Sequence, residues 1–119
     1  MTNKDIGKYG EQLAKEFLMK NKFKILECNF HYSKMAEIDI IAEKNNILHF
    51  VEVKTRSSNF FGTPLEAIDK RKLSSIFSAA NFYIQQHKNK YDKFQIDAIG
   101  IVLKKDNLPE IKFLENISL

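Results

Sequence analysis

The sequence has little cysteine, proline and glycine: 119 residues include one cysteine, two prolines, four glycines and no tryptophan. The single cysteine, Cys28, cannot form an internal disulfide or build a cysteine-ligated zinc site. So few prolines and glycines exclude a collagen-like or low-complexity chain, and 44% hydrophobic residues exclude an intrinsically disordered one. The length suits one hydrophobic core, so we predict a single domain over residues 1–119.

Long apolar runs are absent as well. No stretch approaches the roughly 18 apolar residues of a membrane-spanning helix, and charged and apolar positions alternate through the first 20 residues. We therefore expect no membrane segment, no secretory signal and a cytoplasmic location. The net charge of +4 is compatible with nucleic-acid binding but does not establish it.

Hydrophobic periodicity predicts the element order αβββαββ, an α/β domain whose mixed β-sheet is flanked by helices. Residues 3–20 repeat apolar side chains every three or four positions, as an amphipathic helix does, and a second helix is expected from Pro64 to about His87. Strands are expected at 23–30, 36–44, 47–54, 94–103 and 110–114.

The strands 36–44 and 47–54 are predicted to form a hairpin. Asn45 and Asn46 between them tolerate the positive φ of a two-residue turn. That turn pairs Lys44 with the first residue of the second strand, which sets the register of the whole hairpin.

In this register Asp39 lies opposite Glu52, and Glu37 lies opposite Lys54. Alternation places these four charged side chains at one end of one sheet face, with Ile41 on the same face as Asp39. Opposed carboxylates destabilise a folded protein unless a cation neutralises them. Mg²⁺ and Mn²⁺ are the natural cations, because hard ions bind carboxylate oxygens.

Lys54 lies on the same face as Glu52, where its ammonium group could hold an attacking water or stabilise a developing negative charge. The alternative is a solvated strand end, in which Lys54 and Arg56 only balance the acids. Arg56 and Lys72 are candidates to contact DNA phosphates. The three histidines have no metal-like spacing, and His49 is expected on the strand face opposite Glu52 in a structural role.

Asp39, twelve further residues and then Glu52-Val53-Lys54 resemble the PD-(D/E)xK nuclease motif, although Ile38 replaces its proline. Nearly the whole chain is similar to the YraN family of small bacterial proteins, which is placed in the restriction-endonuclease-like superfamily. The similarity is carried by Gly7-x-x-Gly10-Glu11, Glu37-Ile-Asp39-Ile-Ile, Phe50-Val-Glu-Val-Lys-Thr-Arg56 and Pro64-x-Glu66-Ala67. Ala36 and Gln95 depart from the family, which usually has glycine and arginine there.

The resemblance implies a restriction-endonuclease-like fold and a metal-dependent, resolvase-like DNA endonuclease. Asp39, Glu52, the Val53 carbonyl and Glu11 would ligate Mg²⁺ or Mn²⁺, and Lys54 would be the catalytic lysine. Glu37 would either orient these ligands without binding the metal itself or form an ion pair with Lys54. The implied partner is DNA, branched or single-stranded, and a homodimer is expected by analogy because junction resolution needs two active sites.

Two other functions stay open at this point: a nucleic-acid-binding module that keeps the scaffold without catalysis, and a protein-interaction domain with a structural ion-pair cluster. The complete Asp…Glu-x-Lys set favours the nuclease. A pure binding module gains nothing from opposed carboxylates that repel phosphate.

Overall fold

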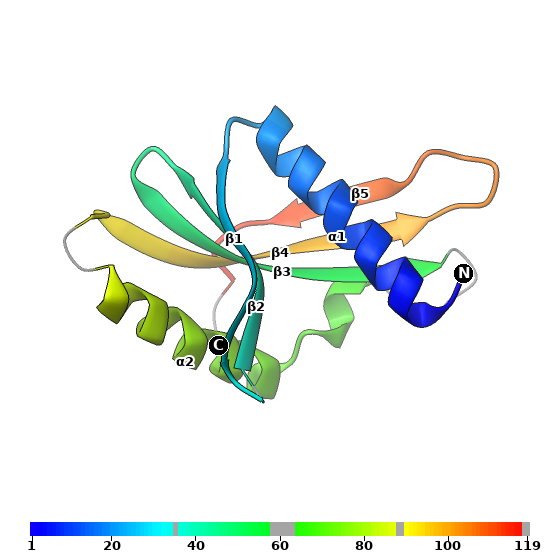
Figure 1. Cartoon of the computed structure of the whole chain (residues 1–119). Coiled ribbons are helices and arrows are strands. Elements are labelled where there is room, and N and C mark those ends of the chain that lie inside the picture. Colours follow the sequence, from blue (N-terminus) through cyan, green and yellow to red (C-terminus); the bar gives the residue numbers. More distant parts are fainter. Residues whose placement is uncertain (35, 58–63, 88–89, 118–119) are drawn as a thin grey trace.

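The computed structural model describes residues 1–34, 36–57, 64–87 and 90–117 and confirms an α/β protein with a mixed sheet (Figure 1). Its elements are α1 (Asn3–Lys20), β1 (Lys24–Ser33), β2 (Ala36–Lys44), β3 (Ile47–Ser57), the short 3₁₀ helix η1 (Pro64–Ala67), α2 (Lys70–Gln86), β4 (Lys93–Leu103) and β5 (Glu110–Leu114). No helix in the described ranges has the length and hydropathy to cross a bilayer.

Three predicted boundaries were wrong. The strand β3 continues to Ser57 instead of ending at residue 54. The first strand continues to Ser33 instead of ending at residue 30. The predicted helix from Pro64 is two elements, because η1 ends at Ala67 and α2 starts only after Asp69. The Asp69 carboxylate accepts a hydrogen bond of 2.9 Å from the Lys72 backbone N–H, and such an N-cap defines where a helix begins.

The sheet has the strand order β1-β2-β3-β4-β5, in which only β3 and β4 run parallel. A parallel pair needs a crossover connection, and η1 and α2 supply it. The two α-helices cover opposite faces of the sheet (Figure 1). One core cluster contains Leu73, Ile76 and Tyr83 of α2, and the other contains Ala14 and Leu18 of α1. The sheet is therefore buried between two helices.

The hairpin register is the one that the turn predicts. Asn45 and Asn46 have φ of 53° and 65°, and the pairs run from Lys44 with Ile47. The ladder between β2 and β3 ends at Ile40 and Val51, while β3 stays paired with β4 as far as Ser57. Beyond Val51 the sheet therefore splits into a β1-β2 half and a β3-β4-β5 half. The predicted pairs of Asp39 with Glu52 and of Glu37 with Lys54 were wrong, because both lie past the end of the ladder.

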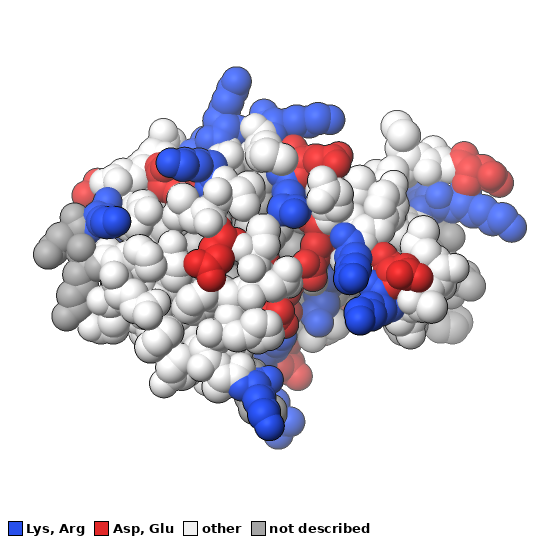
Figure 2. Space-filling model, in the orientation of Figure 1, with Lys and Arg blue, Asp and Glu red and all other residues white. Residues whose placement is uncertain are grey.

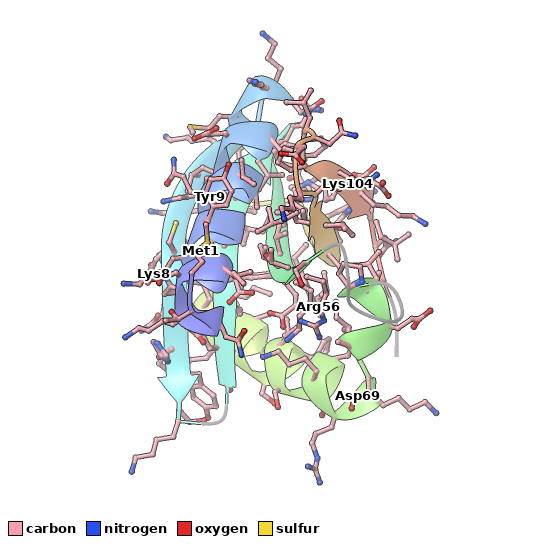
Figure 3. All side chains as sticks on the ribbon, turned by 90° about the vertical axis from the view of Figure 1, so that its right-hand side faces the viewer. Met1, Lys8, Tyr9, Arg56, Asp69 and Lys104 are labelled. Atoms are coloured by element: carbon pink, nitrogen blue, oxygen red, sulfur yellow. The ribbon has the colours of Figure 1, made fainter. Side chains whose placement is uncertain are left out.

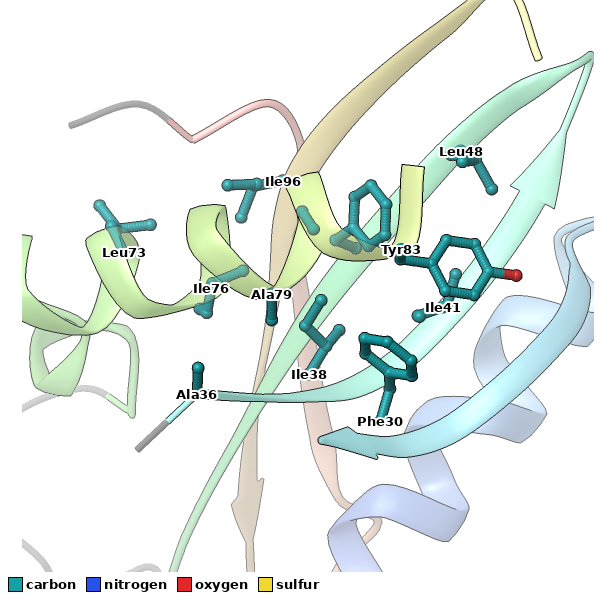
Figure 4. Close-up of a cluster of buried hydrophobic side chains, with 12 residues drawn as sticks. Phe30, Ala36, Ile38, Ile41, Leu48, Leu73, Ile76, Ala79, Tyr83 and Ile96 are labelled. Atoms are coloured by element: carbon teal, nitrogen blue, oxygen red, sulfur yellow. The ribbon is translucent and has the colours of Figure 1, made fainter. Parts of the chain in front are cut away.

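The split overturns the predicted faces of β2. Ile38 and Ile41 are three residues apart, yet both pack into the core cluster against α2 (Figure 4). Strict alternation would have placed them on opposite faces, so the prediction that Ile41 shares the face of Glu37 and Asp39 was wrong, whereas Glu37 and Asp39 do share one face. Once its ladder to β3 ends, β2 can twist together with β1, whose register also shifts between His31 and Ser33.

Candidate functional site

A cleft opens where β2 separates from β3, and four elements line it. Its volume is about 560 Å³. The lining comes from the N-terminal half of α1, the start of β2, the second half of β3 and the first turn of α2. It consists of Asn3, Ile6, Gly7, Glu11, Glu37, Asp39, Glu52, Val53, Lys54, Thr55, Arg56, Ser57 and Lys72. Figure 3 shows Arg56 on the side of the molecule where α1 and α2 both begin. The structure thus brings every predicted site residue to one cleft.

Asp39 marks the point at which the two strands part. Its Oδ2 accepts a hydrogen bond of 2.8 Å from the Val53 backbone N–H. The side chain thereby replaces the ladder bond that β2 no longer makes, which holds the carboxylate in one orientation beside β3.

Glu52 is the most unusual side chain of the cleft, because it is a carboxylate only 2% exposed. Its Oε2 lies 3.3 Å from Lys72 Nζ and 3.7 Å from Lys54 Nζ. Its Oε1 is buried and has no hydrogen-bond partner among the described residues. Burial first and the negative charge of Asp39 second raise the pKa of Glu52 to about 8, although both lysines oppose the shift.

The contact between Lys72 and Glu52 was not predicted from the sequence. It was predicted to contact phosphate, but its ammonium group lies closer to Glu52 than that of Lys54 does. The first turn of α2 carries Lys72 to the cleft, and Asp69 fixes where that turn begins. Because the helix start depends on a loop and a cap, strand periodicity contained no signal for this contact.

Glu11 lines the cleft from α1, but among the described residues it does not form, with Asp39 and Glu52, a group of three acids arranged to hold a metal ion. Burial, Asp39 and Glu37 together raise the pKa of Glu11, while a side-chain hydrogen bond from Asn29 lowers it. Asn29 has a φ of 53° inside β1, a left-handed conformation that asparagine tolerates better than most residues. Sequence reasoning assigned Asn29 no role. The sequence signal for it was its match to an asparagine that the family it resembles has just after its first strand, whereas here Asn29 lies inside β1.

Glu37 lines the cleft, but it does not form the ion pair with Lys54 that was one of its two predicted roles. Glu37 Oε1 lies 3.3 Å from His31 Nε2, and Lys54 pairs with Glu52 instead. The register of β1 and β2 explains this, because His31 lies directly opposite Glu37.

The donor set suits a hard cation only in part. Among the described residues no group of three His, Cys, Asp or Glu side chains is arranged to hold a metal ion. Asp39 and Glu52 nevertheless offer adjacent carboxylates, and the unpartnered Oε1 of Glu52 is a buried acceptor without a donor. Mg²⁺ is commonly bound by one or two carboxylates and keeps several waters, so Asp39 and Glu52 supply the part of a Mg²⁺ site that the protein must provide.

Outside the cleft, His49 lies on the α1 side of the sheet, as alternation predicts. His49 Nδ1 is 2.6 Å from Oδ2 of the fully buried Asp97. Asp97 Oδ1 accepts hydrogen bonds of 2.8 Å from Gln95 Nε2 and from the Asn116 backbone N–H. This network connects β3, β4 and the segment after β5, which is a structural role.

The fold and the cleft define an α/β protein with a split mixed sheet and a buried carboxylate–lysine cluster at the split. Residues 10–101 match the model described as "Uncharacterised protein family UPF0102". The chain belongs to this family, which confirms the YraN-like resemblance.

Curated relatives support the assignment over most of the chain. A UPF0102 protein of Dictyoglomus thermophilum is 45% identical over 105 residues, 88% of each chain. One of Campylobacter hominis is 46% identical over 109 residues, 92% of this chain and 89% of the relative. One of Clostridium novyi is 42% identical over 115 residues, 96% of this chain and 95% of the relative.

Proposed function

We propose that this protein is a metal-dependent nuclease with a restriction-endonuclease-like fold, and that it hydrolyses phosphodiester bonds in DNA. The observation that carries the proposal is Glu52, a buried carboxylate placed against Asp39 with one oxygen unpartnered and two lysines within 4 Å. Such an arrangement destabilises the fold, and strongly perturbed carboxylates of this kind cluster at functional sites.

Asp39, Glu52 and the Val53 carbonyl would hold Mg²⁺ or Mn²⁺, with Glu11 completing the acidic side of the cleft. The bound ion supplies Lewis-acid chemistry and neutralises charge at a phosphodiester. Lys54 has a partly exposed ammonium group that can donate hydrogen bonds to a phosphoryl oxygen or to an attacking water. Arg56 lies farther along the same strand and can contact a flanking phosphate.

The test is cleavage of branched, flap, single-stranded and duplex DNA by purified protein with Mg²⁺ or Mn²⁺. We expect Asp39→Asn and Glu52→Gln to lose about a hundredfold or more in rate. Glu16→Gln is the matched control, because it removes the same charge from an exposed position of α1 outside the cleft. Absence of cleavage by the wild type with either metal and on any substrate would refute the nuclease.

One observation favours a second candidate, a nucleic-acid-binding module without catalysis. Lys54 and Lys72 already place two positive charges at Glu52, so the acidic cluster is partly balanced without a metal. In a binding module the carboxylates only repel phosphate. Asp39→Asn would then leave DNA affinity unchanged or improve it, and no metal would produce cleavage.

A further inference from the structure

Gly7 lies in the interior of α1, one turn before Glu11, and it lines the cleft. A Cβ built on Gly7 would meet no heavy atom within 4 Å. Gly10 is different, because a Cβ there would overlap the Thr55 side chain. The close approach of α1 to β3 therefore requires glycine at position 10 but not at position 7.

The backbone does not require glycine at position 7 either. Its φ lies outside the left-handed range in which glycine is favoured. Glycine is one of the poorest helix formers, so alanine would stabilise α1 at this position. The helix thus has a destabilising residue where neither packing nor conformation calls for one. Glycine leaves the α1 side of the cleft without a side chain at this position.

The charges of the residues on each side of the cleft indicate which part of a ligand faces α1. The α1 residues in the cleft are Asn3, Ile6, Gly7 and Glu11, and none is cationic. The four lysines of α1 lie elsewhere on the helix. The cations of the cleft are Lys54, Arg56 and Lys72, on the β3 and α2 sides. A phosphate is therefore attracted toward β3 and α2, which leaves an uncharged group toward α1.

We propose that the DNA strand processed at Asp39 and Glu52 lies against α1 at Gly7, with a deoxyribose or base facing the bare helix. A neighbouring phosphate then faces Arg56. The inference rests on the proposed function and deepens it, because it makes Gly7 a substrate-contact position one helical turn from Glu11. A side chain at position 7 would occupy the space of the nucleotide.

The test compares Gly7→Ala and Gly7→Leu with Gln12→Leu, which places the same leucine at an exposed α1 position outside the cleft. We expect Gly7→Ala to raise the melting temperature by about 3 °C. Gly7→Leu should weaken single-stranded DNA binding and cleavage by about tenfold to a hundredfold, whereas Gln12→Leu should change neither. The melting temperature of each Gly7 variant tests whether it is folded, and for a folded variant loss of binding reports on the cleft.

The outcomes separate the two proposals. If the wild type cleaves DNA and Gly7→Leu cleaves and binds equally well, the Gly7 inference is wrong and the nuclease stands. If the wild type binds without cleaving, the nuclease is wrong and binding by Gly7→Leu decides the inference. A wild type that neither binds nor cleaves DNA overturns both. A lower melting temperature for Gly7→Ala would reveal a packing role and also overturn the inference.

Discussion

At the scale of single residues, Glu52 determines how the stability of the metal-free protein responds to pH. Burial and the Asp39 charge raise its pKa from 4.5 to about 8, so the folded protein holds this proton more tightly than the unfolded chain. The stability gained from that proton is fully present below about pH 4.5 and is lost as the pH rises through about 8.

Glu52→Gln cannot ionise and should lose this pH dependence. Urea unfolding of both proteins in the absence of metal, from pH 5 to pH 9, measures the difference in free energy of unfolding. As the pH rises, we expect the free energy of unfolding of the variant to increase relative to that of the wild type, by an amount on the order of a few kcal/mol. The raised pKa of Glu11 changes the free energy of unfolding of both proteins in the same way, so its contribution cancels in the difference. Parallel stability curves would show that Glu52 is not the titrating group.

Asp39 allows a test of metal binding that does not depend on activity. Asparagine keeps an oxygen that can accept the Val53 N–H bond, so Asp39→Asn removes charge without removing that anchor. We expect Mn²⁺ to raise the melting temperature of the wild type in a concentration-dependent way and to leave Asp39→Asn unchanged. Without metal the variant should be as stable as the wild type or more stable, because the repulsion on Glu52 is smaller.

Glu16→Gln again serves as the control and should keep the full Mn²⁺ response. The response should also strengthen as the pH rises toward 8, since the metal competes with the Glu52 proton. If Asp39→Asn shows the wild-type shift with Mn²⁺, Asp39 is not a ligand.

At the scale of elements, the contact between α1 and β3 positions one wall of the cleft. Gly10 allows this contact, because any side chain there would overlap Thr55. Alanine stabilises most helix interiors, but here we expect Gly10→Ala to lower the free energy of unfolding by about 1–3 kcal/mol. Gly7→Ala in the same helix should raise it by about 1 kcal/mol. Equilibrium denaturation of the two variants checks the opposite signs.

Thr55→Gly should recover part of the loss in a double variant with Gly10→Ala, because it removes the side chain that alanine meets. A double-mutant cycle measures this coupling. Strictly additive free energies of unfolding would show that the two elements do not meet at this contact.

At the scale of the whole molecule, the charge distribution is mixed and not a single basic field. Acidic and basic side chains meet near the centre of the face in Figure 2, while the net charge of the chain is only +4. This favours recognition by the cleft itself, where three cations and four carboxylates line one space. No broad basic patch of described residues covers this face, so we expect binding of a nucleic acid to depend on local contacts in the cleft.

The homodimer expected by analogy stays a prediction at this scale. Two copies of the cleft are needed to cut both strands of a junction or duplex. Sedimentation velocity at micromolar concentration should give the mass of two chains of 13.9 kDa if the substrate is double-stranded or branched. A strict monomer would restrict the proposed nuclease to nicking or single-strand cleavage.

The sequence alone determined the order of the elements, the hairpin register and the nearness of Asp39 to Glu52. These features depend on local rules, namely hydrophobic periodicity and the positive φ that Asn45 and Asn46 tolerate. Local rules also explain the main errors at the edges of elements, where the cap at Asp69 outweighed the proline that begins η1.

Only the tertiary structure decided where β2 leaves β3, and with it the shape of the cleft. Alternation assumed that the ladder continued past Ile40, whereas the strands part there and Asp39 bonds the β3 backbone instead. The approach of Lys72 to Glu52 and of Asn29 to Glu11 likewise joins segments far apart in the chain. Such contacts depend on how helices pack against a twisted sheet, and no local pattern contains that information.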